Sequence, residues 1–183
     1  MHAILDAGLL AHVGVITDEG PVVLPMAYAR VGARLYLHGA AGNALLRAAE
    51  QAPVCATVTL LDGLVLAKSA FSHSMNFRSV GVFACGRRVE DEGERRLALD
   101  AIVDHVVPRR SAAARPPTAA ELRATRVLAL DLSSASAKVR TGPPVDDEAD
   151  ADWPAWSGVI PLAQVRGDPV AAPPPPDERP SQI

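Results

Sequence analysis

A dense group of polar side chains separates two apolar stretches in the middle of the sequence. The stretches 54–61 and 80–85 have the composition of β-strands. The polar candidates between them are Lys68, Ser69, His73, Asn76, Arg78 and Ser79. An arginine fork, a lysine point charge and several hydroxyl groups together suit a phosphate. The alternative is a polar surface loop with solvated charges, because loops often carry these residue types.

The flanking strands would have to bring these side chains together. Hydroxyl-bearing and apolar residues alternate along 54–61, so one face of this strand is apolar. Asp62-Gly63 predicts a two-residue hairpin turn, because both residues tolerate the positive φ of primed turns. Residues 64–67 would form the returning strand and deliver Lys68 and Ser69 to its end. His73 would follow in a loop, and the next strand would start near residue 77.

The N-terminal part predicts an antiparallel meander. After a short helix over 3–10, strands are expected over 12–17, 21–28 and 34–38, with glycine-containing turns between them. His38, Gly39 and Asn43 then lead into a helix over 44–50. A glycine-bearing loop before a helix can offer N–H groups to an anion, although the motif lacks a stricter pattern. Consecutive antiparallel strands favour a sheet that curls into a barrel.

The second half predicts two further helices and two further strands. Acidic residues open a helix over 90–107, and Thr118 with Glu121 forms a capping box before a short helix. Residues 109–117 are expected to form a loop. Strands are expected over 126–132 and 133–140. Lys138 on the last strand either serves a site or protects an exposed sheet edge from aggregation.

The C-terminal part changes in composition twice. Residues 146–152 are all acidic or alanine and predict a solvated linker. Residues 153–162 are apolar again, and Trp156 is expected to dock onto the domain, over the core or on a flat ligand. Residues 163–183 are polar and proline-rich, which is typical of a disordered tail. One folded domain over 1–162 is therefore expected.

Several classes of function are disfavoured by the composition. A formal charge of −3 without a clustered basic face argues against nucleic-acid binding. No apolar run approaches the roughly 20 residues of a membrane span, and no signal peptide is recognisable at the N-terminus, so a cytoplasmic protein is expected. The two cysteines have no CxxC spacing, and no metal site is predicted. Ser72-His73-Ser74 lacks the nucleophile turn of a hydrolase.

Residues 60–69 followed by residues 73–80 resemble the signature of the pyridoxamine 5'-phosphate oxidase-like flavin-nucleotide-binding proteins. The similarity is to the branch that includes nitroimidazole-resistance proteins. Weaker similar patches are residues 35–39, 106–108, 135–144 and 156–162. The resemblance thus extends from near the N-terminus to about residue 162.

The resemblance implies a mainly β fold, the antiparallel FMN-binding split β-barrel with peripheral helices, assembled as a homodimer with cofactor sites across the interface. It also implies an FMN-dependent oxidoreductase that takes electrons from NAD(P)H or a substrate and passes them to a small organic acceptor. Ala44 departs from relatives, which often carry a basic residue there. The alternative is a non-catalytic flavin- or haem-binding module, with His73 or His38 as the axial haem ligand.

The candidate roles follow from the residues and the resemblance together. His73 is the candidate for proton transfer. The cofactor-binding candidates are His38, Gly39, Asn43, Lys68, Ser69, Asn76, Arg78, Ser79, Lys138 and Trp156.

Overall fold

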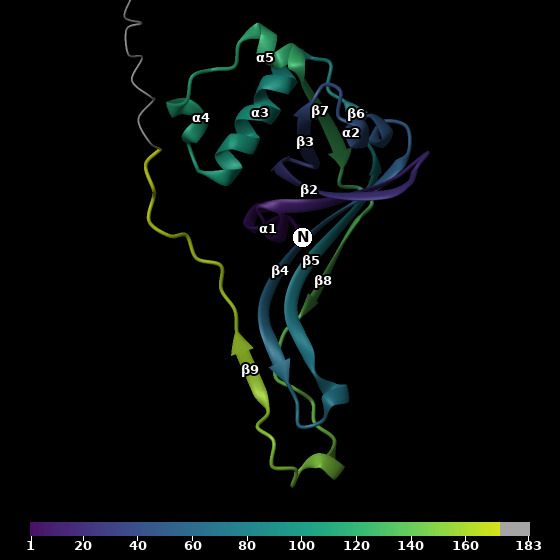
Figure 1. Ribbon diagram of the computed structural model, residues 1–183, viewed down its shortest axis with the longest axis vertical. Coiled ribbons are helices and arrows are strands. Elements are labelled where there is room, and N and C mark those ends of the chain that lie inside the picture. The colour runs from purple at the N-terminus through teal and green to yellow at the C-terminus, as the bar shows by residue number, and fades with distance from the viewer. Residues whose placement is uncertain (173–183) are drawn as a thin grey trace, which may run out of the picture.

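The computed structural model describes residues 1–172 and consists of an antiparallel half-barrel with short helices at its periphery (Figure 1). The strands pair in the order β6-β7-β3-β2-β1-β4-β5-β8, and β9 adds to the free side of β4. The strands are β1 (Leu10–Thr17), β2 (Gly20–Val31), β3 (Arg34–Ala40), β4 (Pro53–Leu66), β5 (Ser74–Cys85), β6 (Arg87–Arg88), β7 (Thr125–Asp131), β8 (Ala135–Arg140) and β9 (Gly158–Pro161). The helices are α1 (His2–Ala7), α2 (Ala44–Ala49), α3 (Glu92–Val106), α4 (Arg110–Ala113) and α5 (Ala119–Ala124), with 3-10 turns η1 (Ala70–Ser72) and η2 (Glu148–Asp150). This architecture confirms the predicted mainly β split-barrel fold.

The N-terminal meander forms as the turn residues predict. Gly20 closes the β1–β2 turn with a φ of 115°, and Gly32 closes the β2–β3 turn with a φ of 60°. Both conformations lie in the left-handed region that glycine adopts without steric cost. The predicted strands and turns of this part are therefore confirmed.

The predicted hairpin at Asp62-Gly63 is wrong. Strand β4 continues through it to Leu66, and its pairing with β5 shifts by one residue between Leu61 and Gly63, which is a β-bulge. The positive-φ glycines of the described residues are Gly20, Gly32 and Gly142, so Gly63 does not adopt the turn conformation. A Cβ atom on Gly63 would lie 3.0 Å from Val159 Cγ1, so the glycine admits β9 beside β4. The chain reverses instead through residues 67–73.

The helix caps follow the sequence. Asp91 caps α3 by accepting a hydrogen bond of 2.7 Å from the backbone of Glu94. The predicted capping box at Thr118 and Glu121 is present at the start of α5. The loop predicted over 109–117 contains the extra helix α4. Helix α3 packs its buried residue Ile102 against the sheet, and α4 and α5 complete a cover on the same side (Figure 1).

The core has two layers on opposite faces of the half-barrel. The larger lies inside the barrel and includes Tyr28, whose hydroxyl donates to the carbonyls of Leu5 and Gly8 at 2.5 and 3.0 Å and holds α1 in place. The smaller lies between the sheet and α3 and includes Tyr36 and Ile102.

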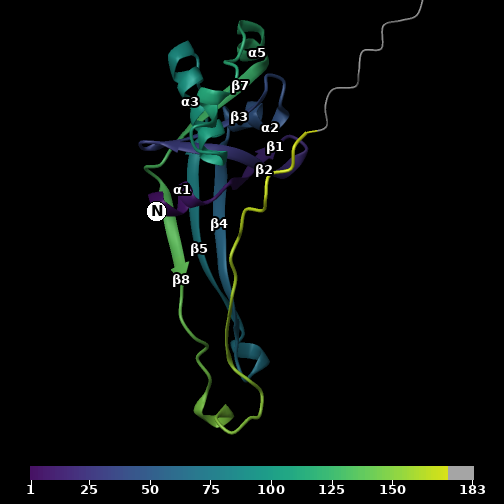
Figure 2. The same ribbon diagram turned by 90° about the vertical axis from the view of Figure 1, so that its left-hand side faces the viewer.

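Strands β4 and β5 project beyond the barrel as a long arm (Figures 1 and 2). The acidic segment 146–152 closes its far end, where the carboxylate of Asp146 accepts a 2.6 Å hydrogen bond from the backbone N–H of Lys68. From there β9 returns along β4. Residues 163–172 have no regular secondary structure, and residues 173–183 of the predicted tail lie outside the described residues. Within residues 1–172, no helix is long and apolar enough to cross a membrane.

Candidate functional site

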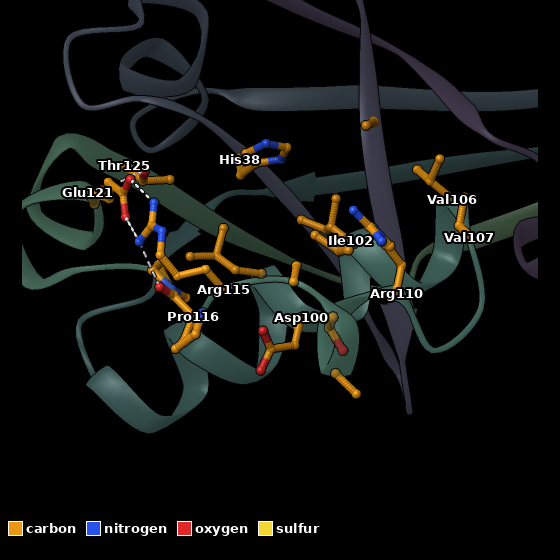
Figure 3. Close-up of a pocket in the computed structure, with 17 residues that line it drawn as sticks. His38, Asp100, Ile102, Val106, Val107, Arg110, Arg115, Pro116, Glu121 and Thr125 are labelled. Carbon is orange, nitrogen blue, oxygen red and sulfur yellow. Dashed lines mark hydrogen bonds and ion pairs between the residues drawn. The ribbon is translucent and has the colours of Figure 1, made fainter. Parts of the chain in front are cut away.

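A cavity of about 800 Å³ lies between the sheet and helices α3, α4 and α5 (Figure 3). Side chains of α3 form most of its apolar wall, and Pro116 and Pro117 close it from the loop before α5. The lining residues of α3 are Leu99, Asp100, Ile102, Val103 and Val106. A cavity of this size with mainly apolar walls suits an organic ligand or cofactor.

His38 supplies the cavity with an imidazole from β3. Along this strand Leu35 and Leu37 belong to the core inside the barrel, so the alternation of a strand turns Tyr36 and His38 to the side covered by α3. The His38 Nδ1 atom is buried and has no hydrogen-bond partner among residues 1–172. Because burial disfavours the charged ring, the pKa of His38 lies below its usual value of 6.5. The neutral imidazole can bind a metal or form a hydrogen bond with a ligand.

The rim of the cavity carries charged groups, in contrast to its apolar wall. Arg115 donates two hydrogen bonds of 2.7 and 3.1 Å to the carboxylate of Glu121 (Figure 3). This guanidinium, together with the Thr118 cap, lowers the pKa of Glu121 to about 2. Arg110 also lines the cavity, and no ion pair found among residues 1–172 involves it. The arrangement suits a flat apolar molecule with an anionic edge.

Gly39 and Asn43, which follow His38 in the sequence, have structural roles here. The Asn43 side chain caps α2 by accepting a 3.0 Å hydrogen bond from the backbone N–H of Leu46. A Cβ atom on Gly39 would lie 2.9 Å from Leu46 Cδ1, so glycine allows the helix to approach the strand.

The residues predicted to form one phosphate site are spread along the arm. Lys68, Ser69 and His73 lie at its tip, where His73 Nδ1 lies 2.9 Å from the carbonyl of Ser69 and Lys68 Nζ donates to the carbonyl of Ala151. Arg78 pairs with Leu60, eight residues before Lys68, which corresponds to on the order of 20 Å of extended strand. The predicted single cluster is therefore wrong, because it depended on the hairpin at Asp62-Gly63.

Arg78 already has an anionic partner. Its guanidinium donates two hydrogen bonds of 2.8 and 2.7 Å to the Asp62 carboxylate, which lowers the pKa of Asp62. Asn76 is buried and is also paired, because it donates to the carbonyl of Gly142 at 3.0 Å and accepts from Arg140 at 2.6 Å. These contacts hold the arm together.

The remaining candidates lie on open surfaces. Ser79 and Lys138 are cross-strand neighbours on β5 and β8, and Lys138 Nζ lies 5.8 Å from the centre of the Phe77 ring. Trp156 is 63% exposed, and its ring packs against Gly158 instead of the core.

The sequence identified His38 but not the walls around it. Helices α3, α4 and α5 lie more than fifty residues after His38, and no local pattern connects them to that strand. The apolar stripe on α3 indicated that this helix packs on the sheet, without showing that the packing leaves a cavity.

The chain is similar to a known protein family and to several solved structures. The sequence model described as pyridoxamine 5'-phosphate oxidase matches residues 1–139. The structure of the flavocytochrome Anf3 from Azotobacter vinelandii is similar at 42% identity with a TM-score of 0.85, and the match covers 100% of this chain and 84% of that one. The FAD and haem binding protein from Mycobacterium smegmatis is similar at 38% identity with a TM-score of 0.88, covering 97% and 87% of the two chains.

A more distant similarity supports the predicted branch. A 5-nitroimidazole antibiotic resistance protein from Bacteroides thetaiotaomicron is 25% identical, with a TM-score of 0.63 and coverage of 74% of this chain and 80% of that one. A comparison with curated protein sequences gives no match. The family match and the two more similar structures agree with the half-barrel described above. The chain belongs to the pyridoxamine 5'-phosphate oxidase family.

Proposed function

We propose that this protein is a flavin-binding oxidoreductase that also holds a haem, with His38 as an iron ligand. The observation that carries the proposal is the buried, unpaired Nδ1 of His38 at the wall of an apolar cavity. It is supported by two similar proteins, one described as a flavocytochrome and the other as a protein that binds FAD and haem.

The residues around His38 fit a haem in three respects. Burial keeps the imidazole neutral, which is the form that binds iron. Ile102, Val103 and Val106 offer an apolar wall to a porphyrin and exclude water from it. Arg110 at the rim offers a charge to the carboxylate groups of the haem. When bound, the haem would supply one-electron chemistry.

The proposed flavin cofactor is FMN or FAD. In this proposal NAD(P)H or a reduced substrate supplies the electrons, and a small organic molecule or the haem accepts them. The flavin supplies the electron chemistry, and the chain provides binding and orientation. The second candidate function is a flavin-only oxidoreductase in which His38 contacts the substrate. The apolar cavity also has room for a small organic substrate beside His38, which is the observation that supports this second function.

We also propose that two copies pair through the outer face of the sheet formed by β1, β4, β5 and β8. This face exposes Ile16, Leu61 and Phe83 to 66%, 44% and 54%, and exposed apolar residues gathered on one face are typical of an interaction surface. The split-barrel proteins that the sequence resembles are homodimers with cofactor sites across the interface.

Cys55 and Cys85 are free thiols, which supports a reducing compartment such as the cytoplasm.

The test is the absorption spectrum of the full-length protein, with flavin and haem supplied during production. We expect flavin bands together with a Soret band. His38→Ala should remove the Soret band and leave the flavin bands, whereas the matched change His73→Ala at the exposed arm tip should leave both. Flavin bands without a Soret band in the wild-type protein would favour the flavin-only function. A colourless protein would overturn both functions.

A further inference from the structure

Residues 108–117, between the end of α3 and the start of α5, form one wall of the cavity. This segment, called the lid below, contains α4, and most of its residues line the cavity, among them Arg110, Arg115 and Pro116 (Figure 3). The lining residues of the lid are also accessible from outside. The lid therefore separates the space beside His38 from solvent on this side of the cavity.

The lid has no apolar anchor in the core. None of residues 108–117 is buried, and Ser111 and Pro117 are only half-buried. The neighbouring helices differ in this respect, because Ile102 of α3 and Leu122 of α5 are buried. A segment with few buried apolar contacts opens at a lower free-energy cost than the elements around it.

The chain is held on both sides of the lid. Before it, the guanidinium of Arg166 donates a 2.8 Å hydrogen bond to the carbonyl of Val106 at the end of α3. After it, the capping box of Thr118 and Glu121 fixes the first turn of α5. These attachments confine an opening motion to residues 108–117.

The two ends of the lid have the backbone of hinges. Arg109 has a φ of 65° and is the non-glycine residue with a positive φ among residues 1–172. This left-handed conformation strains a residue with a side chain, so a rotation at Arg109 relieves strain and favours opening. At the other end, Pro116 and Pro117 have no backbone N–H with which to hold the chain.

A polar latch joins the lid to α3. The Asp104 carboxylate accepts hydrogen bonds of 2.7 and 2.8 Å from the backbone N–H and the hydroxyl of Ser111. These hydrogen bonds lower the pKa of Asp104, so the carboxylate is ionised at neutral pH. Both residues are half-buried, and water can take over their hydrogen bonds when the latch opens.

We propose that residues 108–117 open at Arg109 and the two prolines to admit a large flat ligand, and close on it through the Asp104–Ser111 latch. The inference rests on the proposed haem binding and adds the route by which a haem reaches His38. A porphyrin is rigid and cannot change its shape to pass a narrow opening. The wall without buried residues is the one that can move aside for it.

The first experiment measures how fast hemin enters and leaves the full-length protein produced without added haem. Stopped-flow absorption gives the association rate, and transfer to excess apomyoglobin gives the dissociation rate. Asp104→Ala should raise both rates by about fivefold or more, because the lost hydrogen bonds favour the open lid by about this factor. The dissociation constant should change less than threefold. Ser111→Ala removes one of the two hydrogen bonds and should show a smaller rise in both rates.

The matched control removes a polar contact of α3 far from the lid. Glu92→Gln weakens the ion pair of Glu92 with Arg96 in the first turns of the helix, and both hemin rates should stay within twofold of wild type. A faster dissociation of hemin from Asp104→Ala with an unchanged association rate would show that the residue supports the bound haem without controlling entry. That result, or two unchanged rates, would overturn the inference.

Hydrogen exchange followed by mass spectrometry tests the latch without haem. Peptides from residues 108–117 should exchange faster in Asp104→Ala and in Ser111→Ala than in the wild type, and peptides from α5 should not change. Equal exchange of the lid in all three proteins would overturn the latch. A wild-type protein that binds no hemin would overturn the proposed haem function and the entry route, while the exchange rates still decide whether Asp104 holds the lid. Circular dichroism establishes that each variant is folded.

Discussion

The arm and the cavity contain similar polar residues, but they differ in how fully those residues are paired. On the arm Arg78 is held by Asp62, Asn76 by Gly142 and Arg140. In the cavity the Nδ1 of His38 is buried and finds no hydrogen-bond partner in the described part of the chain. A buried polar group without a partner costs about 1–3 kcal/mol, which a bound ligand can recover. Unused hydrogen-bonding capacity therefore distinguishes the candidate site better than residue type does.

The largest expected effect comes from the packing that forms the cavity wall. Ile102→Ala should lower the free energy of unfolding by about 2–5 kcal/mol, because Ile102 is buried against the sheet and its loss leaves a void. Val103→Ala is the matched control on the same helix, since Val103 is 39% exposed and should cost less. Urea unfolding of both variants measures the difference. Equal costs would contradict the view that Ile102 supports the wall.

Asn76→Ala tests whether the arm is held together by its own polar contacts. We expect the free energy of unfolding to fall by about 1–3 kcal/mol, because the change leaves the buried groups around Asn76 unpaired. Flavin and haem content, measured from the absorption spectrum, should stay unchanged in the folded variant. Loss of cofactor from a folded Asn76→Ala protein would restore Asn76 as a cofactor-binding residue.

The free energy of unfolding should depend on pH because the His38 imidazole is buried in its neutral form. Because the pKa of folded His38 lies below 6.5, the unfolded chain binds a proton first as the pH falls. The free energy of unfolding of the cofactor-free protein should therefore decrease below about pH 6.5. His38→Asn should lose less stability than the wild type between pH 7.5 and pH 5 in urea titrations. Identical pH profiles would show that His38 is not desolvated.

The smallest effect is expected for Arg78→Ala. Its guanidinium is engaged by Asp62 on a solvent-accessible part of the arm, where ion pairs contribute little. FMN and FAD affinity should stay within twofold of wild type, because the guanidinium is already occupied by Asp62. The pKa of Asp62, followed by NMR titration, should rise towards its ordinary value when the arginine is removed. A tenfold loss of FMN affinity would restore Arg78 as a phosphate-binding residue.

The capping box of α5 could be predicted from the sequence, whereas the path of the chain at Asp62-Gly63 could not. The capping box at Thr118 and Glu121 depends on residues three apart, and the sequence predicted it correctly. Asp62-Gly63 has an equally clear local signal for a turn, yet β4 continues through it because β5 and β9 pair on both of its sides. Because β4 continues, Lys68 lies at the tip of the arm and far from Arg78. The two residues therefore do not form the predicted phosphate site.

The alternation of the strands, the glycine turns of the meander and the helix caps could be predicted from the amino-acid order. These depend on backbone sterics and on hydrogen bonds between residues close in the chain. The long-range packing shows that the arginine of the arm is neutralised by Asp62 and that His38 lines a cavity. Such pairings join residues tens of positions apart, so they depend on strand register and helix packing, which no local pattern contains.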